Sequence, residues 1–490
     1  MKALLTLPRK PILNSINKSL IYSLAESYLC MLIQIASSMI IARLLTPSEI
    51  GKFSIGMAAL AIAHMLRDFG VGAYMVHAKE LTKQDMKAVF GIAILTAWSL
   101  AAALYFARYA IAGFYHEPAL AEILGWMCIN FLVIPFSSTV FPLLMREMKF
   151  HLLFYINLIP TLLSSGLSIY LAYHGYGYMS LVWGSLANIS LAAVMATGLR
   201  PRYSFVLPSL KGSLHILAFG GKASLTNIVA QIGNNAAELM IGKTLGFASV
   251  ALFSKAQTLT EMFSHQFLGA ITKVYFPAIA QRHRDALPIN SAYADSTVYI
   301  TAFAFPFFGF MALYAEEIIL IMFGSQWLAS AELIRILALG GCLYAITAFA
   351  PNTINAIGKP GLLLRIQLFI QCFRIGVTLP AAFMSLSMVA WAQTVTFGVG
   401  LFIYLPVLRY LIQLNAWRLL GRIFAANLIM AALALALPFA IKHYLEVQGL
   451  PTVGLLALAG GSFALSWVVA LFVTRNPLAG QFMKMLGKKP

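Results

Sequence analysis

The stretch MIIARLLTPSEIGKFS, residues Met39–Ser54, has a related copy 200 residues later, LMIGKTLGFASVALFS at Leu239–Ser254. At this constant spacing four positions are identical, namely Ile41/Ile241, Leu45/Leu245, Phe53/Phe253 and Ser54/Ser254. A second match has a spacing of 210 residues, where the loop Met145–Phe150 corresponds to Asn355–Pro360 and Lys149 corresponds to Lys359. Two ordered matches at nearly equal spacings predict an internal duplication.

The composition places the duplicated chain in a membrane. Of its 490 residues, 60% are hydrophobic and only 10% are charged, whereas soluble domains are about 25% charged. Apolar stretches of roughly 20 residues, long enough to cross a bilayer core of about 30 Å, recur along the chain. They predict an all-α integral membrane protein with about fourteen transmembrane helices, at 19–41, 53–75, 88–108, 120–142, 151–173, 178–198, 214–240, 247–271, 293–314, 331–352, 361–383, 388–411, 421–441 and 452–473.

The two copies are predicted to form two six-helix lobes. Six predicted helices separate the copies, and because six is even, both copies have the same orientation in the membrane. Parallel repeats of this kind surround a central cavity in many transporters. The predicted organisation is an N-terminal lobe at 1–212, a C-terminal lobe at 213–415, and two additional helices with a cytoplasmic tail at 416–490.

The basic residues predict the orientation. With both termini in the cytoplasm, 24 of the 34 Lys and Arg residues lie on the cytoplasmic side and five on the opposite side, as the positive-inside rule requires. The net charge of +18 therefore indicates contact with anionic membrane lipids and argues against nucleic acid as a partner. No apolar run has the length and flanks of a cleavable signal peptide, so the first helix is expected to remain as an anchor in the inner (plasma) membrane.

Three segments resemble one transporter family. They are ARLLTPSEIG at Ala42–Gly51, RDFGVGAYMV at Arg67–Val76 and LLMREMKF at Leu143–Phe150. Together with the helix number and the repeat, they are similar to the polysaccharide-transporter (Wzx-like oligosaccharide flippase) branch of the multidrug/oligosaccharidyl-lipid/polysaccharide (MOP) exporter superfamily. The resemblance implies two six-helix lobes plus two C-terminal helices, and export of a polyprenyl-pyrophosphate-linked oligosaccharide. A polysaccharide polymerase or export machinery is then an expected partner.

Polar residues at helical spacing are the candidates for contacting such a substrate. A cavity for a lipid-linked glycan needs cations for phosphate and amides or hydroxyls for sugars. The alternative is that these side chains only bond neighbouring helices. The stripes are Glu26, Cys30, Gln34 and Ser37 in the first helix; Asn227, Gln231, Asn234, Asn235 and Glu238 in the seventh; Gln257, Glu261 and His265 in the eighth; and Gln367, Gln371, Arg374 and Thr378 in the eleventh.

The charges inside the predicted helices suggest more specific roles. Arg67, Lys222 and Arg374 are candidates for binding a pyrophosphate, although Lys222 also lies close enough to a helix end to snorkel. His64, Arg67 and Asp68 fall at i, i+3 and i+4 and so share a helix face, on which His64 is expected to pack. Arg67 and Asp68 either form a structural ion pair or act on the substrate as it enters. Candidates for a coupling ion or proton are Glu26, Asp68, Glu238 and Glu261. Lys255 and Arg335 are expected to be anchors or ion-pair partners, with Glu332 one turn before Arg335.

The sequence favours a transporter over an enzyme. It has no Walker loop, metal-ligand spacing or catalytic triad, and we expect no cofactor or metal. The four cysteines lie in predicted spans, where they pack as small apolar residues. The short predicted outer loops disfavour a polysaccharide polymerase or ligase. The alternative function is a cation-coupled multidrug exporter of the same superfamily, although the intramembrane cations favour an anionic cargo.

Overall fold

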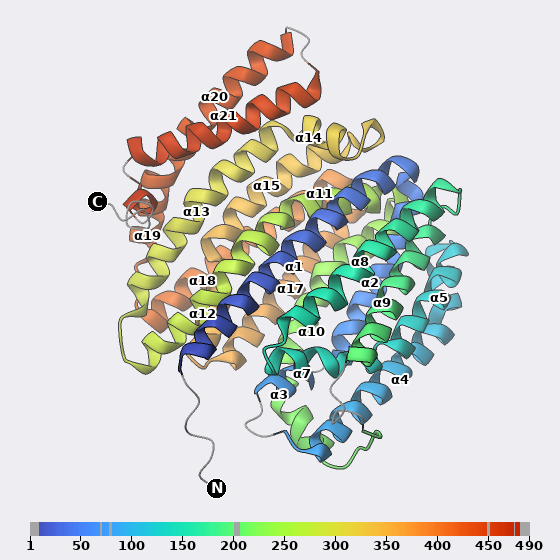
Figure 1. Ribbon diagram of the computed structural model, residues 1–490. Helices are drawn as coiled ribbons and strands as arrows, with labels where there is room; N and C mark the ends of the chain where they lie inside the picture. Colours follow the sequence, from blue (N-terminus) through green and yellow to red (C-terminus); the bar gives the residue numbers. More distant parts are fainter. Residues whose placement is uncertain are drawn as a thin grey trace. The chain divides into compact units, whose positions relative to one another are not determined.

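The computed structural model describes residues 9–68, 71–77, 81–199, 206–447, 451–474 and 476–480. Its elements are all helices in this described part (Figure 1). The side chains of Asp68, Lys222 and His265 lie outside the described set. The chain divides into two compact units, Met1–Asn235 and Ala236–Pro490, and helix α10 continues from the first unit into the second. The predicted boundary at 212/213 lies just before this helix and stays a prediction.

Unit 1 is a bundle in which α1 packs on α8, α8 on α9, and α4 on α5. The predicted span 120–142 consists of three helices, α5 to α7, because Pro135 begins α6 without an N–H group to continue α5. The helices of unit 1 are α1 (Arg9–Leu44), α2 (Pro47–Asp68), α3 (Val71–His77), α4 (Lys83–Tyr115), α5 (Ala119–Val133), α6 (Pro135–Ser138), α7 (Val140–Arg146), α8 (Phe150–Tyr173), α9 (Met179–Leu199) and the first part of α10 (Ser213–Thr244).

Unit 2 is built around α15, which packs against α11, α13 and α18. The eighth predicted span of the chain, 247–271, lies in this unit and contains a π-helix, η2, between α11 and α12. Its elements are the end of α10, α11 (Phe247–Met262), η2 (Phe263–Leu268), α12 (Gly269–Arg284), α13 (Ile289–Leu313), α14 (Ala315–Met322), η3 (Ser325–Trp327), α15 (Ser330–Thr347), α16 (Ala350–Ala356), α17 (Pro360–Ala382), α18 (Leu386–Ile412), α19 (Ala416–Ile423), η4 (Phe424–Leu428), α20 (Ile429–Val447) and α21 (Thr452–Val473).

The chain is a multi-pass membrane protein. Within the described residues, twelve helices are long and apolar enough to cross a bilayer. The predicted spans 214–240 and 247–271 are helical but are not among these twelve. The second of these spans is divided at η2, which leaves α11 with 16 residues. The total of fourteen spans therefore stays a prediction.

Both pairs of matching segments have the same local geometry. Leu45 N–H donates to Ile41 O at 2.9 Å, and Leu245 N–H donates to Ile241 O at 2.8 Å. At the spacing of 210, Lys149 N–H donates to Leu144 O at 2.9 Å and Lys359 N–H to Ile354 O at 3.1 Å. Met148 and Gly358, the residues just before these lysines, both have a positive φ, 57° and 77°. The matched sequences thus form matched turns at the same places in the two halves.

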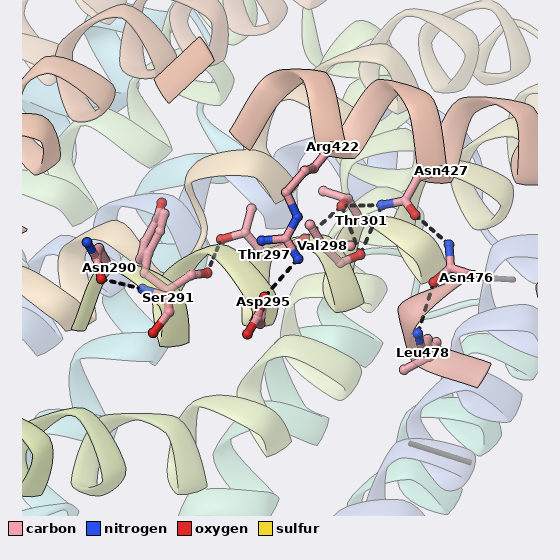
Figure 2. Close-up of polar contacts among 11 residues, drawn as sticks. Asn290, Ser291, Asp295, Thr297, Val298, Thr301, Arg422, Asn427, Asn476 and Leu478 are labelled. Carbon is pink, nitrogen blue, oxygen red and sulfur yellow. Dashed lines mark hydrogen bonds and ion pairs between the residues drawn. The ribbon is translucent and has the colours of Figure 1, made fainter. Parts of the chain in front are cut away.

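Polar contacts fasten the C-terminal helices to α13 (Figure 2). Asn427 in η4 is fully buried, and its amide donates to Val298 O at 2.9 Å and to Thr301 Oγ1 at 2.8 Å. Its Oδ1 accepts from Asn476 Nδ2 at 2.8 Å, while Arg422 pairs with Asp295 at 2.8 Å. In Figure 1, α20 and α21 lie side by side as a hairpin along this edge of unit 2.

Candidate functional site

The polar stripe of α17 lies in the interior of unit 2. Gln371, Arg374 and Thr378 are 5%, 7% and 1% exposed. The Gln371 Nε2 atom donates to Gln367 Oε1 at 3.3 Å, and Gln367 Nε2 donates to Tyr404 Oη at 3.0 Å. One face of this membrane helix therefore presents a continuous row of amide, guanidinium and hydroxyl groups to the protein interior.

Arg374 is surrounded by aromatic and acidic side chains. The centre of its guanidinium lies 5.7 Å from the Phe397 ring, and the Tyr344 ring lies 5.4 Å from the same ring. The Glu261 carboxylate and Tyr344 interact electrostatically with the guanidinium. A buried charge requires such compensation, because an unpaired one costs several kcal/mol.

The acidic side of the cluster comes from α10 and α11. Glu261 accepts a hydrogen bond from Gln257 Nε2 at 2.7 Å, and Glu238 is hydrogen-bonded to Ser254. The two carboxylates interact with each other electrostatically. Five helices thus contribute to this group of side chains, which we call the unit 2 cluster: Glu238, Ser254, Gln257, Glu261, Tyr344, Gln367, Gln371, Arg374, Phe397 and Tyr404.

The unit 2 cluster has unused hydrogen-bonding capacity. The Oε1 atoms of Gln257 and Gln371 are buried and receive no hydrogen bond within the described part of the chain. Buried acceptors of this kind are costly unless a donor reaches them. Hydroxyl groups of water or of a sugar would satisfy both.

Unit 1 has a corresponding row that the sequence analysis missed. On α8, Thr161, Ser164 and Ser168 are buried, and Asn157 precedes them on the same face. Asn157 Nδ2 donates to Glu26 Oε1 at 2.6 Å, which joins the row to α1. The four residues correspond to Gln367, Gln371, Arg374 and Thr378 at the spacing of 210 residues. Applying the repeat to the α17 stripe would have found them.

A family model described as "Polysaccharide biosynthesis protein" matches residues 40–332, which is more than half of the chain. The chain belongs to this family.

Curated relatives of the chain come from several bacteria. The teichuronic acid biosynthesis protein TuaB of Bacillus subtilis (strain 168) is 23% identical, over 82% of this chain and 84% of the relative. The succinoglycan biosynthesis transport protein ExoT of Rhizobium meliloti (strain 1021) is 27% identical, over 64% and 63%. The lipopolysaccharide biosynthesis protein WzxC of Escherichia coli (strain K12) is 20% identical, over 63% of each chain.

Solved structures of two transporters share the fold of this chain. The lipid II flippase MurJ in an inward closed conformation matches with a TM-score of 0.74 at 15% identity, over 96% of this chain and 100% of that one. An inward-facing multidrug resistance MATE family transporter of the MOP superfamily matches with a TM-score of 0.64 at 17% identity, over 78% and 94%. The resemblance inferred from the short sequence segments is confirmed.

The seventh predicted span is exposed on more than its polar face. In α10, Asn227 and Asn234 are exposed and Gln231 is half-buried, whereas Ile228 between them is 6% exposed. However, Leu225 and Ile232 on this helix are also exposed, at 45% and 40%. Gln34 on α1 is exposed as well. Their exposure leaves these amides accessible, and their contact with water stays a prediction.

The cations in other helices have different surroundings. Arg67 is half-buried, and because the side chain of Asp68 lies outside the described set, both interpretations of this pair remain predictions. His64 stacks on Phe131 with ring centres 4.6 Å apart. Arg335 pairs with Glu316 at 2.7 Å and not with Glu332, which accepts a hydrogen bond from Ser387 at 2.8 Å. The predicted pairing of Arg335 with Glu332 is wrong, because the neighbouring helix α14 places Glu316 at the guanidinium.

The described residues contain no group of three or more His, Cys, Asp or Glu side chains arranged to hold a metal ion. The side chains of the unit 2 cluster offer charge, amide and aromatic groups around one buried guanidinium.

Proposed function

We propose that this chain is a flippase that moves a polyprenyl-pyrophosphate-linked oligosaccharide from the cytoplasmic to the periplasmic leaflet during polysaccharide synthesis. The observation that carries the proposal is the buried Arg374 of the unit 2 cluster, in a multi-pass membrane protein of the polysaccharide biosynthesis protein family. Curated relatives are named for the synthesis or transport of teichuronic acid, succinoglycan and lipopolysaccharide, all of which are surface glycans.

The unit 2 cluster has the chemistry that the charged part of this substrate needs. A guanidinium binds a phosphate through parallel charge-assisted hydrogen bonds. Glu261 interacts electrostatically with Arg374 and balances its charge. A pyrophosphate that replaces Glu261 at the guanidinium would leave the carboxylate free to take up a proton or cation, which makes Glu261 and its neighbour Glu238 coupling candidates.

Amide, hydroxyl and aromatic groups suit the sugars. In unit 2 these groups are Gln367, Gln371, Tyr344, Phe397 and Tyr404, and two amide oxygens of the cluster lack donors. We further propose Gln34, Asn227, Gln231 and Asn234 as sugar contacts, and Arg67 and Lys222 as additional phosphate contacts. Glu26 and Asp68 are the corresponding coupling candidates in unit 1.

The multidrug-exporter alternative is weaker. The family model and the curated relatives are polysaccharide proteins, and the MATE transporter matches a smaller share of the chain than MurJ does. The proposed transporter lies in the inner membrane with both termini in the cytoplasm, and receives its substrate from, and delivers it to, the polysaccharide synthesis and polymerisation machinery.

The test is a deletion strain of the native host. We expect loss of the surface polysaccharide and accumulation of lipid-linked repeat units in the inner leaflet, where an externally added glycan-modifying reagent does not reach them in spheroplasts. The purified chain in proteoliposomes should then make a fluorescent polyprenyl-pyrophosphate oligosaccharide accessible to an external quencher. Normal export in the deletion strain, or accumulation of the repeat units in the outer leaflet, would contradict the proposal.

A further inference from the structure

A cavity of about 670 Å³ lies between α4 and α5 of unit 1, apart from the polar stripes. Its walls are mostly apolar, with two charged side chains, and the residues that matter here are Trp98, Tyr105, Arg108, Glu122, Gly125 and Leu132. The proposed transport of a glycan uses none of them.

The cavity is elongated along the helices. Arg108 on α4 lies opposite Gly125 on α5. Ten residues before Arg108, the Trp98 indole donates at 3.3 Å to the carbonyl oxygen of Leu132, which is seven residues after Gly125. At 1.5 Å per residue of α-helix, one end of the cavity is charged and the other end, about 10–15 Å away, is apolar.

The charged end lies at the depth of lipid headgroups. Arg108 follows Lys87 by 21 residues on the same helix, a rise of about 32 Å. This distance is close to the hydrocarbon thickness of about 30 Å. With Lys87 at one surface of the membrane, Arg108 reaches the other.

Arg108 is held in place but is only partly satisfied by the protein. A side chain at position 125 would place its Cβ atom 2.6 Å from Arg108 Nη1, so Gly125 makes room for the guanidinium. The guanidinium carbon lies 3.8 Å from the Tyr105 ring centre, and Nη2 donates to Tyr109 Oη at 2.9 Å. Arginine has five N–H donors. The N–H group at Nε of Arg108 is buried and donates to no acceptor among the described residues.

The second charge of the cavity is not paired with the first. Glu122 is exposed and accepts a hydrogen bond from Tyr178 Oη at 3.0 Å. Among the described residues no ion pair joins it to Arg108, although both line the same cavity. A cation and a carboxylate that face one cavity without neutralising each other match a ligand that carries both charges.

We propose that this cavity is a binding site for a phospholipid with a zwitterionic, primary-amine headgroup, namely phosphatidylethanolamine. The phosphate contacts Arg108, the ammonium group contacts Glu122 and the faces of the neighbouring tyrosines, and an acyl chain extends towards Trp98 and Leu132. A primary ammonium has three N–H donors for a carboxylate, which a choline headgroup lacks. An anionic lipid such as phosphatidylglycerol would place its negative charge beside Glu122.

The test uses the full chain in vesicles and the fluorescence of its tryptophans. Lipids with brominated acyl chains quench a nearby indole, and the ethanolamine, glycerol and choline lipids are compared at equal mole fraction. We expect the ethanolamine lipid to quench most strongly, and the double variant Trp98→Phe, Trp126→Phe to remove the excess, because both tryptophans line the cavity. Arg108→Gln should lower the relative affinity for it about fivefold, the effect of one charge-assisted hydrogen bond near the surface.

Glu122→Gln gives the sharper result, because its exposed side chain is not needed for folding. It leaves Arg108 as the single charge, so the preference should change from phosphatidylethanolamine to phosphatidylglycerol. Arg335→Gln, which removes an arginine from an exposed ion pair in unit 2, should leave the preference unchanged. Equal quenching by all three lipids, a preference for phosphatidylglycerol in the unaltered protein, or a preference that survives both Arg108→Gln and Glu122→Gln would each overturn the proposal.

Discussion

Replacing Arg374 by glutamine separates its structural role from its role in transport. The guanidinium is 7% exposed and balances Glu261 in the interior of unit 2. Removing one member of a buried pair costs about 3–5 kcal/mol, because the other charge is left behind. The hydrogen bond that Glu261 accepts from Gln257 at 2.7 Å is present with and without the arginine, so it does not change this difference. Because Glu261 is half-buried, we expect the lower end of this range, a decrease in the free energy of unfolding of about 3 kcal/mol for Arg374→Gln.

The double variant Arg374→Gln, Glu261→Gln tests what the arginine does. Both charges are gone, so the free energy of unfolding should return to near the wild-type value. Transport should not return, because the pyrophosphate has lost its guanidinium. Arg374→Lys should keep part of the transport, since an ammonium group preserves the charge but not the bidentate geometry.

The assay measures abundance and thermal unfolding of each purified variant, export of surface polysaccharide in a deletion strain, and flipping in proteoliposomes. Arg335→Gln is the matched control, since its 2.7 Å pair with Glu316 is exposed and is expected to contribute 0–1 kcal/mol. If the double variant recovers transport together with stability, Arg374 only neutralises Glu261, and its assignment as the phosphate ligand is wrong.

Three other regions give separate expectations. Gly91→Ala would place a Cβ atom 2.5 Å from the backbone oxygen of Ser209, so it should destabilise the chain by about 1–3 kcal/mol in thermal unfolding. Gly166→Ala is the control: its Cβ atom would have no neighbour within 4 Å, so it should be neutral or slightly stabilising. Asn427→Leu leaves the partners of a fully buried amide without their hydrogen bonds, so it should lower the free energy of unfolding by about 1–3 kcal/mol. It should also make α20 and α21 more sensitive to limited proteolysis. Unchanged cleavage would contradict the anchoring role of Asn427. An alkaline phosphatase fused after Lys489 should be inactive and one fused near Gly175 active, and the reverse pattern would refute the predicted topology.

Composition and periodicity were sufficient to predict an all-α membrane protein and the polar face of α17. Both depend on local properties, namely the solvent that surrounds a helix and the spacing of its polar residues. The row on α8 was missed because Thr161, Ser164 and Ser168 are small and neutral, and such residues are common in membrane helices that only pack together.

The contacts between helices distant in sequence could not be predicted. The sequence suggested Glu332 for Arg335 because the two are three residues apart, but the carboxylate that reaches the guanidinium comes from Glu316, 19 residues away. The pairing of Glu26 with Asn157 spans 131 residues. Each depends on which helices are neighbours in the folded bundle, and periodicity within a single helix carries no information about that.

The two matched rows, on α8 and on α17, differ in charge. Serine at 164 and alanine at 61 in unit 1 correspond to Arg374 and Glu261 in unit 2. Small polar residues contribute about 0.6 kcal/mol to helix association in a membrane, whereas an arginine at mid-membrane costs at least about 2.5–3.5 kcal/mol. Only the row on α17 in unit 2 contains the costly arginine, and only unit 2 has a glutamate at the matching position, Glu261 on α11, to balance it. In the proposed function, Arg374 in the charged row of unit 2 binds the pyrophosphate, and the row on α8 of unit 1 contains no corresponding cation. The carboxylate joined to the row on α8, Glu26, already accepts a hydrogen bond from Asn157 at 2.6 Å, and Ser164 accepts one from Asn188 at 3.1 Å. Placing an arginine at Ser164 would bury a second cation and break the bond from Asn188, and should impair both stability and export.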